Sequence, residues 1–435
     1  MVIFKAGAEP LLGLAAYLKP FSALVRRSES KHALERYTTG LLSDLSRKTA
    51  SDIGRALPGT NDQRLREFLT NTTWDAREMD RLRIAHMAKH ATAGDGVLVV
   101  DDTGVAKKGT HSVGVARQYS GTLGRVDNCQ VLVTAHYVDR VFDWPVMSRL
   151  YLPEQWATDS ARRGKAHVPS EIDFQTKGKI ALGLIDEGRD AGIEPKAVLT
   201  DAGYGDQTPF LDGMEARQVP YGAAVGVAVR FRLADAVEAD PGDPPAPEYS
   251  GKGRPPKPAA LEDRISNLEV RAILDELPAE AWSQVAWREG TKGALVKECA
   301  RVRVYRCGQR GKHIASSGWL IGERPLEGHS GDQKQYFVWG LDGLGLEELV
   351  GLLHVRWVIE RFYQDAKGEL GLDDYEGRLW TGLHRHLALV MLAHCFLTLQ
   401  QSYGAAVVDP NPAATARGFP PRGEKKHRRT EADGT

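Results

Sequence analysis

The fold is decided by the stretch VLVVDDTG at residues 97–104. Four apolar residues in a row predict a buried strand, and two carboxylates follow at its end. Successive side chains of a strand point to opposite faces, so only one of the two aspartates can face a given site. We assign that place to Asp102 rather than to Asp101. The simpler interpretation is a strand-terminal aspartate that caps a turn.

The same pattern returns in AVLTDAGYG at residues 197–205, where Asp201 ends a second apolar run. The glycines after Asp201 would let another backbone or a phosphate approach closely. Taken alone, Asp201 could also be a turn cap. Two strand ends that carry carboxylates in one chain are harder to explain in that way.

A third acidic residue falls in RWVIERFYQDAK at residues 356–367, which predicts a helix. At about 100° per residue, Arg356, Glu360 and Lys367 project within roughly 40° of one another. One carboxylate between two cations suits a metal ion and the charge of a phosphate group. The alternative is an exposed Arg–Glu pair with an unrelated lysine, but the helix is apolar elsewhere, which weakens it.

The elements around these stretches follow the order β-β-β-α-β-α-β. We predict strands at 96–101, 130–138, 145–152, 196–200 and 219–225, with helices at 170–191 and 208–217. A carboxylate ends the first and the fourth strand, which is the ribonuclease H-like order. The predicted fold class is therefore α/β, with a ribonuclease H-like catalytic domain, a β-rich insertion and a helical N-terminal domain.

A chain of 435 residues is too long for one ordinary core, and we divide it into five segments. Residues 1–90 carry 15 Lys/Arg against 10 Asp/Glu and form a helical domain that is predicted to bind DNA. Residues 91–228 and 341–405 are the two parts of the catalytic domain, the second with helices at 346–370 and 379–402. Between them, 229–340 hold a mobile Pro/Gly-rich loop (234–262), a helix (261–277) and the β-rich insertion. Residues 406–435 are predicted to be a disordered tail.

The amino-acid composition excludes few classes of protein. The 57 basic and 57 acidic residues cancel, so net charge does not indicate a nucleic-acid partner. The four cysteines lack the spacing of a zinc site or a disulfide framework, which fits a reducing cytosol. The apolar patch at residues 11–18 is too short to span a membrane. These features predict a cytoplasmic protein without a membrane partner.

The spacing Arg356-x3-Glu360-x6-Lys367 resembles the Tyr-x2-Arg-x3-Glu-x6-Lys signature of DDE transposases of bacterial insertion sequences. The resemblance extends over about residues 30–405 and includes YQDAKGELGLD at 363–373. It implies that Asp102, Asp201 and Glu360 are the catalytic, metal-binding carboxylates. The signature tyrosine is replaced by Leu353, so Tyr363 or His354 takes over its phosphate contact or the contact is missing.

The resemblance also implies metal-dependent cleavage at the ends of an insertion sequence and transfer of the 3′-hydroxyl into target DNA. Two Mg²⁺ ions, for which Mn²⁺ could substitute, would be held by the carboxylates, because hard oxygen ligands favour these cations. The partners would be the terminal inverted repeats, target DNA and a second copy in a synaptic homodimer.

Six residues are predicted to contact DNA or its phosphates. Three lie on the Glu360 helix and three in the insertion: Arg356, Tyr363 and Lys367, and Arg288, Lys292 and Trp319.

The main alternative is a transposase-derived DNA-binding protein or repressor without catalytic activity. An aspartic protease is a distant alternative, because residues 102–104 read Asp-Thr-Gly. That chemistry needs a second aspartate followed by Thr or Ser, and position 202 is Ala. A haloacid-dehalogenase-like phosphatase is equally remote, since its Asp-x-Asp-x-Thr sequence is not present after the first strand.

Overall fold

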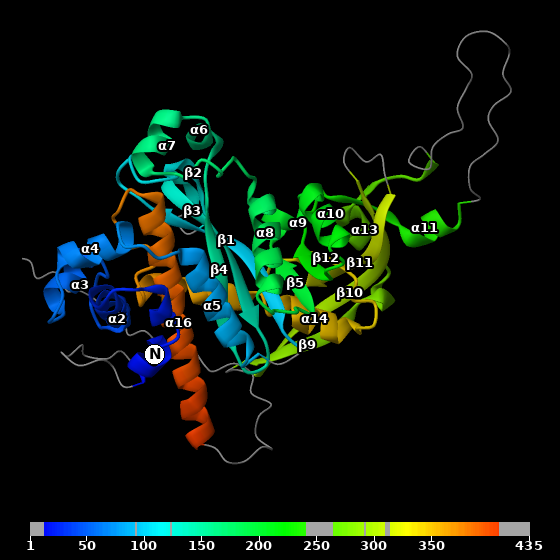
Figure 1. Ribbon diagram of the computed structural model, residues 1–435. Coiled ribbons are helices and arrows are strands. Elements are labelled where there is room, and N and C mark those ends of the chain that lie inside the picture. Colours follow the sequence, from blue (N-terminus) through cyan, green and yellow to red (C-terminus); the bar gives the residue numbers. More distant parts are fainter. Residues whose placement is uncertain are drawn as a thin grey trace, which may run out of the picture.

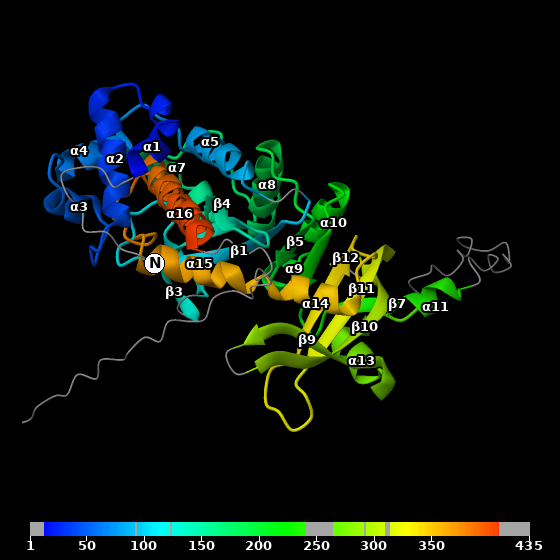
Figure 2. The same ribbon diagram turned by 90° about the horizontal axis from the view of Figure 1, so that it is seen from below.

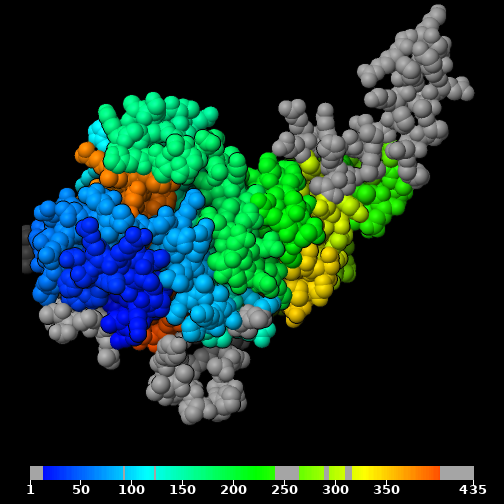
Figure 3. All heavy atoms as spheres, in the orientation of Figure 1, coloured from blue at the N-terminus to red at the C-terminus, as the bar shows by residue number. Residues whose placement is uncertain are grey.

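The computed structural model describes residues 13–91, 94–121, 124–240, 264–290, 293–308 and 314–408 (Figure 1). The predicted tail beyond residue 408 lies outside these residues, as do Lys292 and most of the Pro/Gly-rich loop. A helical N-terminal region lies at one end of the molecule and the β-rich insertion at the other (Figures 1 and 3).

The N-terminal region is helical, as the residue spacing predicts. Its elements are α1 (Leu14–Leu18), η1 (Phe21–Leu24), α2 (Ser28–Leu42), α3 (Ala50–Ala56), α4 (Asp62–Thr70) and α5 (Ala76–Ala88). The side chains of Thr49, Asn61 and Asp75 accept hydrogen bonds from backbone amides in the first turns of α3, α4 and α5. These caps satisfy donors that have no partner within the helix, and they fix where each helix begins.

The catalytic sheet has the strand order β4-β3-β1-β5-β6. These strands are β1 (Val97–Ala106), β3 (Arg125–Val138), β4 (Asp143–Tyr151), β5 (Ala197–Thr200) and β6 (Tyr221–Ala224). The pairs β1–β3 and β3–β4 are antiparallel, and the pairs β1–β5 and β5–β6 are parallel. This arrangement agrees with the predicted ribonuclease H-like order. The short strand β2 (Ala116–Ser120), which the sequence pattern did not predict, pairs with the start of β3.

Helices α6 (Glu154–Ala157), α7 (Ser160–Ala166), α8 (Lys177–Asp190), α9 (Ala202–Gly205) and α10 (Thr208–Ala216) connect these strands. The helix predicted from residue 170 begins only at Lys177, because the Thr176 side chain caps it by accepting from the amide of Lys179. Helix α8 packs on β3 and β4, while α15 (Trp357–Gly368) packs on β1 and β4. Figure 2 shows α8 and α15 on opposite faces of the sheet.

The insertion continues the catalytic sheet. It comprises β7 (Arg230–Leu233), α11 (Ala234–Glu238), β8 (Leu268–Glu269), α13 (Val270–Asp275), η2 (Ala279–Ala281), β9 (Ser283–Gly290), β10 (Gly293–Cys307), β11 (Ile314–Arg324) and β12 (Lys334–Trp339). Strand β12 pairs antiparallel with β6, so the described strands form one 12-stranded sheet. Two predictions are corrected. Residues 234–238 form a helix anchored by the buried Ala234, and within its described part, from residue 264, the helix expected at 261–277 is interrupted by strand β8 before α13 begins.

The prediction of one helix over residues 346–370 is wrong. Two helices, α14 (Leu346–His354) and α15, meet at a turn formed by Val355 and Arg356. There the amides of Val358 and Ile359 bond to carbonyls three residues back, which tightens the chain into a short 3₁₀-like turn. The turn places Arg356 at the start of α15 rather than in the middle of a long helix.

The last helix, α16 (Trp380–Val408), passes between the N-terminal helices and β4. Residues 380–401 are long and apolar enough to cross a membrane, with a mean hydropathy of 1.3, but 94% of this apolar window is buried against the rest of the protein. A core helix has the same composition, so the helix is weak support for a membrane span.

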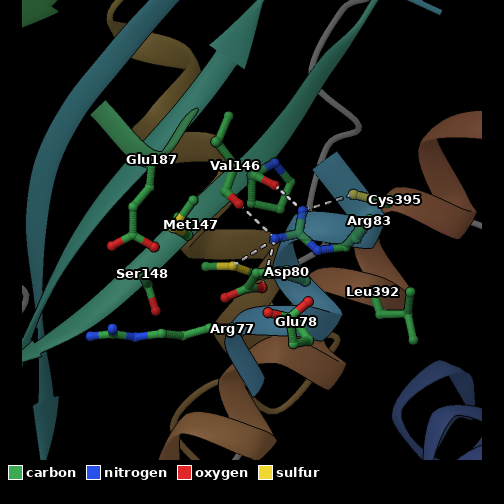
Figure 4. Close-up of polar contacts among 12 residues, drawn as sticks. Arg77, Glu78, Asp80, Arg83, Val146, Met147, Ser148, Glu187, Leu392 and Cys395 are labelled. Carbon is green, nitrogen blue, oxygen red and sulfur yellow. Dashed lines mark hydrogen bonds and ion pairs between the residues drawn. The ribbon is translucent and has the colours of Figure 1, made fainter. Parts of the chain in front are cut away.

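A buried polar cluster joins α5, β4 and α16 (Figure 4). The Arg83 guanidinium, which is 0% exposed, donates to the carbonyls of Pro145 and Val146, both at 2.6 Å, and to Asp80 at 2.9 Å. Its contact with Cys395 Sγ is 3.6 Å. Because a buried charge without partners is costly, this cluster fixes how the N-terminal helices sit on the sheet.

Candidate active site

Two carboxylates are brought together by neighbouring parallel strands. Val100 of β1 pairs with Thr200 of β5, so Asp101 and Asp201 follow equivalent positions on adjacent strands. Asp201 also begins α9, where its carbonyl accepts from the amide of Gly205 at 2.9 Å. A Cβ at Gly203 would lie 3.1 Å from Asp201 Oδ1, so glycine at that position leaves room beside the carboxylate.

The neighbouring aspartates of β1 face different helices. Asp101 accepts from Arg356, at the start of α15, at 3.0 Å. Asp102 accepts from Lys177 of α8 at 2.9 Å and from the Tyr204 hydroxyl at 3.5 Å. The alternation of side chains along the strand therefore puts Asp101, not Asp102, on the face covered by the Glu360 helix. Sequence spacing could not choose between the two, because it does not show which face that helix covers.

The polar side of α15 lies along β1. Arg356 donates to Glu360 at 3.1 Å as well as to Asp101, and the Glu360 side chain is 66% exposed. The Lys367 ammonium donates to Thr103 Oγ1 at 2.7 Å and to the Gly104 carbonyl at 2.9 Å. The structure thus brings the predicted Arg356, Glu360 and Lys367 together at one strand, as the helical spacing predicts.

Nearby positive charge only partly offsets the burial and crowding of Asp101 and Asp201. Burial, together with the nearby Asp201, raises the pKa of Asp101 to about 7 against the opposing effect of Arg356. Burial likewise raises the pKa of Asp201, and its Oδ1 is buried without a hydrogen-bond partner. Crowded carboxylates that protonate too easily are stabilised by a bound cation, which competes with the proton for the same oxygens.

The donor set is all oxygen, which fits a hard divalent cation. Among the described residues, however, no group of three or more His, Cys, Asp or Glu side chains is already arranged to hold a metal ion. Arg356 occupies the position between Asp101 and Glu360 by bonding to both. Metal binding on this face would require Glu360 to leave Arg356, and its exposure leaves it free to move.

The other predicted DNA contacts are engaged within the protein. The Tyr363 hydroxyl pairs with Thr134 Oγ1 at 2.6 Å. The guanidinium of Arg288 lies 4.7 Å from the ring centre of Trp357. Those of Arg301 and Arg303 lie 4.7 Å and 5.0 Å from the ring centre of Trp319. These cation–π contacts join the insertion to α15 on one side and stabilise its own strands on the other.

Leu353, at the position of the signature tyrosine, is a core residue with 4% exposure. It packs against β6 so closely that a Cβ at Gly222 would lie 2.5 Å from it. The adjacent His354 bonds to Glu323 at 2.9 Å and stacks on Trp287 with ring centres 3.8 Å apart. His354 Nε2 and the Tyr363 hydroxyl are thus both paired within the protein.

A sequence model described as a DDE superfamily endonuclease matches residues 20–294. The chain belongs to this family. The match contains both aspartate stretches and ends before Glu360, so the role of Glu360 rests on its own surroundings. Endonucleases of the DDE superfamily generally use divalent metals, in keeping with the oxygen donors described above.

One relative is a "probable transposase for insertion sequence element IS701" from Microchaete diplosiphon. It is 30% identical over 210 residues, which are 48% of this chain and 52% of the relative. The chain thus matches about half the length of this curated relative. The family match and this relative confirm the resemblance to insertion-sequence transposases.

Proposed function

We propose that this DDE endonuclease is a DNA transposase that cuts at the ends of an insertion sequence and transfers the free 3′-hydroxyl into target DNA. One observation carries the proposal. The ends of two parallel strands supply Asp101 and Asp201 to the face of the sheet on which α15 presents Glu360, Arg356 and Lys367. Paired carboxylates beside fixed cations suit the hydrolysis and exchange of phosphodiesters.

The first carboxylate of the site is proposed to be Asp101, because it shares a face with Glu360. Asp102, the residue predicted from the sequence, has Lys177 as its partner on the other face. The variants Asp101→Asn and Asp102→Asn distinguish the two aspartates.

The aspartates and Glu360 would hold two Mg²⁺ ions, or Mn²⁺, which activate the attacking oxygen and stabilise the leaving oxygen during in-line displacement. Arg356 would be released from Glu360 to bind a phosphate oxygen as a planar, bidentate donor. Lys367, fixed by Thr103 and Gly104, would place a positive charge beside the reacting phosphate. Water attacks first and frees a 3′-hydroxyl, and that hydroxyl then attacks the target strand.

The proposed partners are the terminal inverted repeats, target DNA and a second copy of the chain, acting in the cytoplasm. The N-terminal helices α2–α5 are proposed to contribute to DNA binding, and the insertion, with Arg288, Lys292 and Trp319, to grip the element end.

The test is cleavage of linear DNA that carries the sequences flanking this gene, with Mg²⁺ and with EDTA. The parent chain is expected to cut at defined ends only with metal, and Glu360→Gln is expected to bind the same DNA without cutting it. Defined binding with no cutting by the parent would instead identify the inactive, repressor-like relative. If the parent chain neither binds nor cuts this DNA, the proposal is overturned.

A further inference from the structure

A cleft of about 490 Å³ opens where β1 ends, and four of its eleven lining residues are lysine or arginine. Arg47, Lys107, Lys108 and Arg378 contribute positive charge, against the two acidic residues Asp373 and Glu376. His111 adds a further nitrogen donor. We call this hollow the β1 cleft. Its charge contrasts with the carboxylates that lie a few residues earlier on the same strand.

The floor of the β1 cleft is held in place by hydrogen bonds. The Asn128 side-chain amide donates to the carbonyls of Lys107 at 2.6 Å and Gly109 at 2.9 Å. The Lys107 ammonium donates to the Tyr375 carbonyl at 2.6 Å, and the amide of Val113 donates to the carbonyl of Arg378 at 3.2 Å. A turn fixed at both ends orders its side chains before any ligand arrives, which lowers the entropy lost on binding.

Several donors in this cleft are available to a ligand. Within the described part of the chain, the side chains of Lys108, His111 and Arg378 are exposed and make no hydrogen bond or ion pair. Arg47 is engaged, since it bonds to Glu376 at 2.6 Å, but both partners of that pair are more than half exposed. An exposed pair of this kind contributes about 0–1 kcal/mol, so a phosphate can replace the carboxylate.

The β1 cleft adjoins the Lys367 end of the candidate active site, because Lys367 bonds to Gly104 and the lining of the cleft begins at Ala106. Asp373 attracts both the Lys107 ammonium of the cleft and the Lys367 ammonium, which bonds to Thr103 and Gly104. On the other side, a second hollow of about 630 Å³ shares Tyr375, Glu376 and Arg378 with the cleft and reaches Ser51 and Arg66 of the N-terminal helices. The shared residues place the two hollows side by side between the end of β1 and those helices.

We propose that the β1 cleft binds the sugar–phosphate backbone of duplex DNA next to the phosphodiester that reacts at the carboxylates. The inference rests on the proposed function and extends it to a separate binding surface. The fixed ammonium of Lys107 and the exposed guanidinium of Arg378 can bind backbone phosphates whatever the base sequence. Glu376 competes with the phosphate for Arg47 and weakens binding.

Binding of the full-length chain to a short labelled duplex of arbitrary sequence tests the proposal. The measurement is made in EDTA over a salt series. Lys108→Ala and Arg378→Ala are each expected to weaken binding and to lower the slope of log K against log salt by about one, the effect of losing one phosphate contact. Glu376→Gln is expected to tighten binding. A folding defect cannot produce that opposite sign. The matched control is Arg189→Ala, an exposed arginine in the last turn of α8, which is expected to leave the slope unchanged.

Salt slopes that stay unchanged in Lys108→Ala and Arg378→Ala would overturn the proposal. The same measurement is repeated with a single-stranded DNA probe. Slopes that change with that probe but not with the duplex would also overturn it. Cleavage by the parent chain with Mg²⁺ is read separately. If the parent cuts and the slopes do not move, only the cleft assignment fails. If the slopes move and the parent never cuts, the transposase proposal fails and the DNA-binding surface remains.

Discussion

Two polar clusters of this molecule lie at joints between elements that are far apart in sequence, and they are built in opposite ways. Around Arg83, both terminal nitrogens of a fully buried guanidinium have oxygen partners at 2.6–2.9 Å. Around Asp101 and Asp201, carboxylates crowd together, one oxygen has no partner, and Glu360 points outward. The charge of the first cluster is balanced without a ligand, although Arg83 Nε is buried without a partner. A cation would stabilise the second cluster further than Arg356 alone does, which supports its proposed role as the place of chemistry.

The largest expected effect is on catalysis. Asp101→Asn, Asp201→Asn and Glu360→Gln each remove a charge that the metal needs, so cutting should fall by far more than the roughly 100-fold that follows loss of an outer partner of a metal ligand. The measurement is the single-turnover rate of end cleavage with Mg²⁺, with DNA binding in EDTA as a check on folding.

Asp102→Asn is the matched control, because it makes the same change one residue later, on the opposite face of the strand. It should keep most of the cutting rate if Asp101 is the ligand. The reverse result, with cutting lost only in Asp102→Asn, would restore the assignment made from the sequence.

The second effect concerns stability and belongs to the Arg83 cluster. Arg83→Ala leaves Asp80 buried beside one remaining partner, Arg149, at 3.3 Å. The free energy of unfolding should therefore fall by about 3–5 kcal/mol. Urea unfolding measures this loss. Arg81→Ala, two residues away on α5 and in an exposed pair with Glu78, should change stability by less than about 1 kcal/mol. Equal losses of unfolding free energy in both variants would mean that the buried Arg83 cluster stabilises the protein no more than an exposed ion pair does.

The third effect is a pH dependence at another buried joint between the N-terminal helices and α16. The Gly371 carbonyl can only accept, so His386 Nε2 carries the proton and Nδ1 accepts from the Tyr37 hydroxyl at 2.9 Å. Burial lowers the pKa of His386 from 6.5 to about 4. The unfolded chain therefore takes up the proton first, and up to about 3 kcal/mol of stability should be lost as pH falls from 6.5 to 4.

Urea unfolding across this pH range checks the sign. His386→Gln should remove its own share of the dependence, because burial also lowers the pKa of His384 to about 4 and that of His394 to about 3. The exposed His32→Gln should leave the dependence as it is in the parent chain. A parent chain whose stability rises as pH falls from 6.5 to 4 would contradict the assigned tautomer and burial.

The contrast between the clusters also explains what could be predicted from the sequence. Asp201, Glu360 and the Arg356–Lys367 spacing were visible because strand ends and helical periodicity are local patterns. The order of elements along the chain followed from the same patterns, except that β2 was missed. The choice between Asp101 and Asp102 was not local, because it depends on which face α15 covers. The break at Val355–Arg356 was also missed, because helical periodicity persists through a 3₁₀-like turn. The β1 cleft joins residues near 47, 108 and 378, and no sequence window contains all three.

The smallest expected effect comes from Lys367, whose charge is held beside β1 but does not bind the metal. Lys367→Ala should slow strand transfer by roughly 10–100-fold, less than loss of a carboxylate, because one positive charge near the phosphate is removed while the metal ligands stay. Stability should change little, since Thr103 and Gly104 lie on a paired strand. Arg361→Ala, on the same helix with its partner Asp365 at 3.8 Å, is the matched control and should transfer strands at the parent rate. Strand transfer slowed equally in both variants would trace the loss to a disturbed α15 instead of to the Lys367 charge.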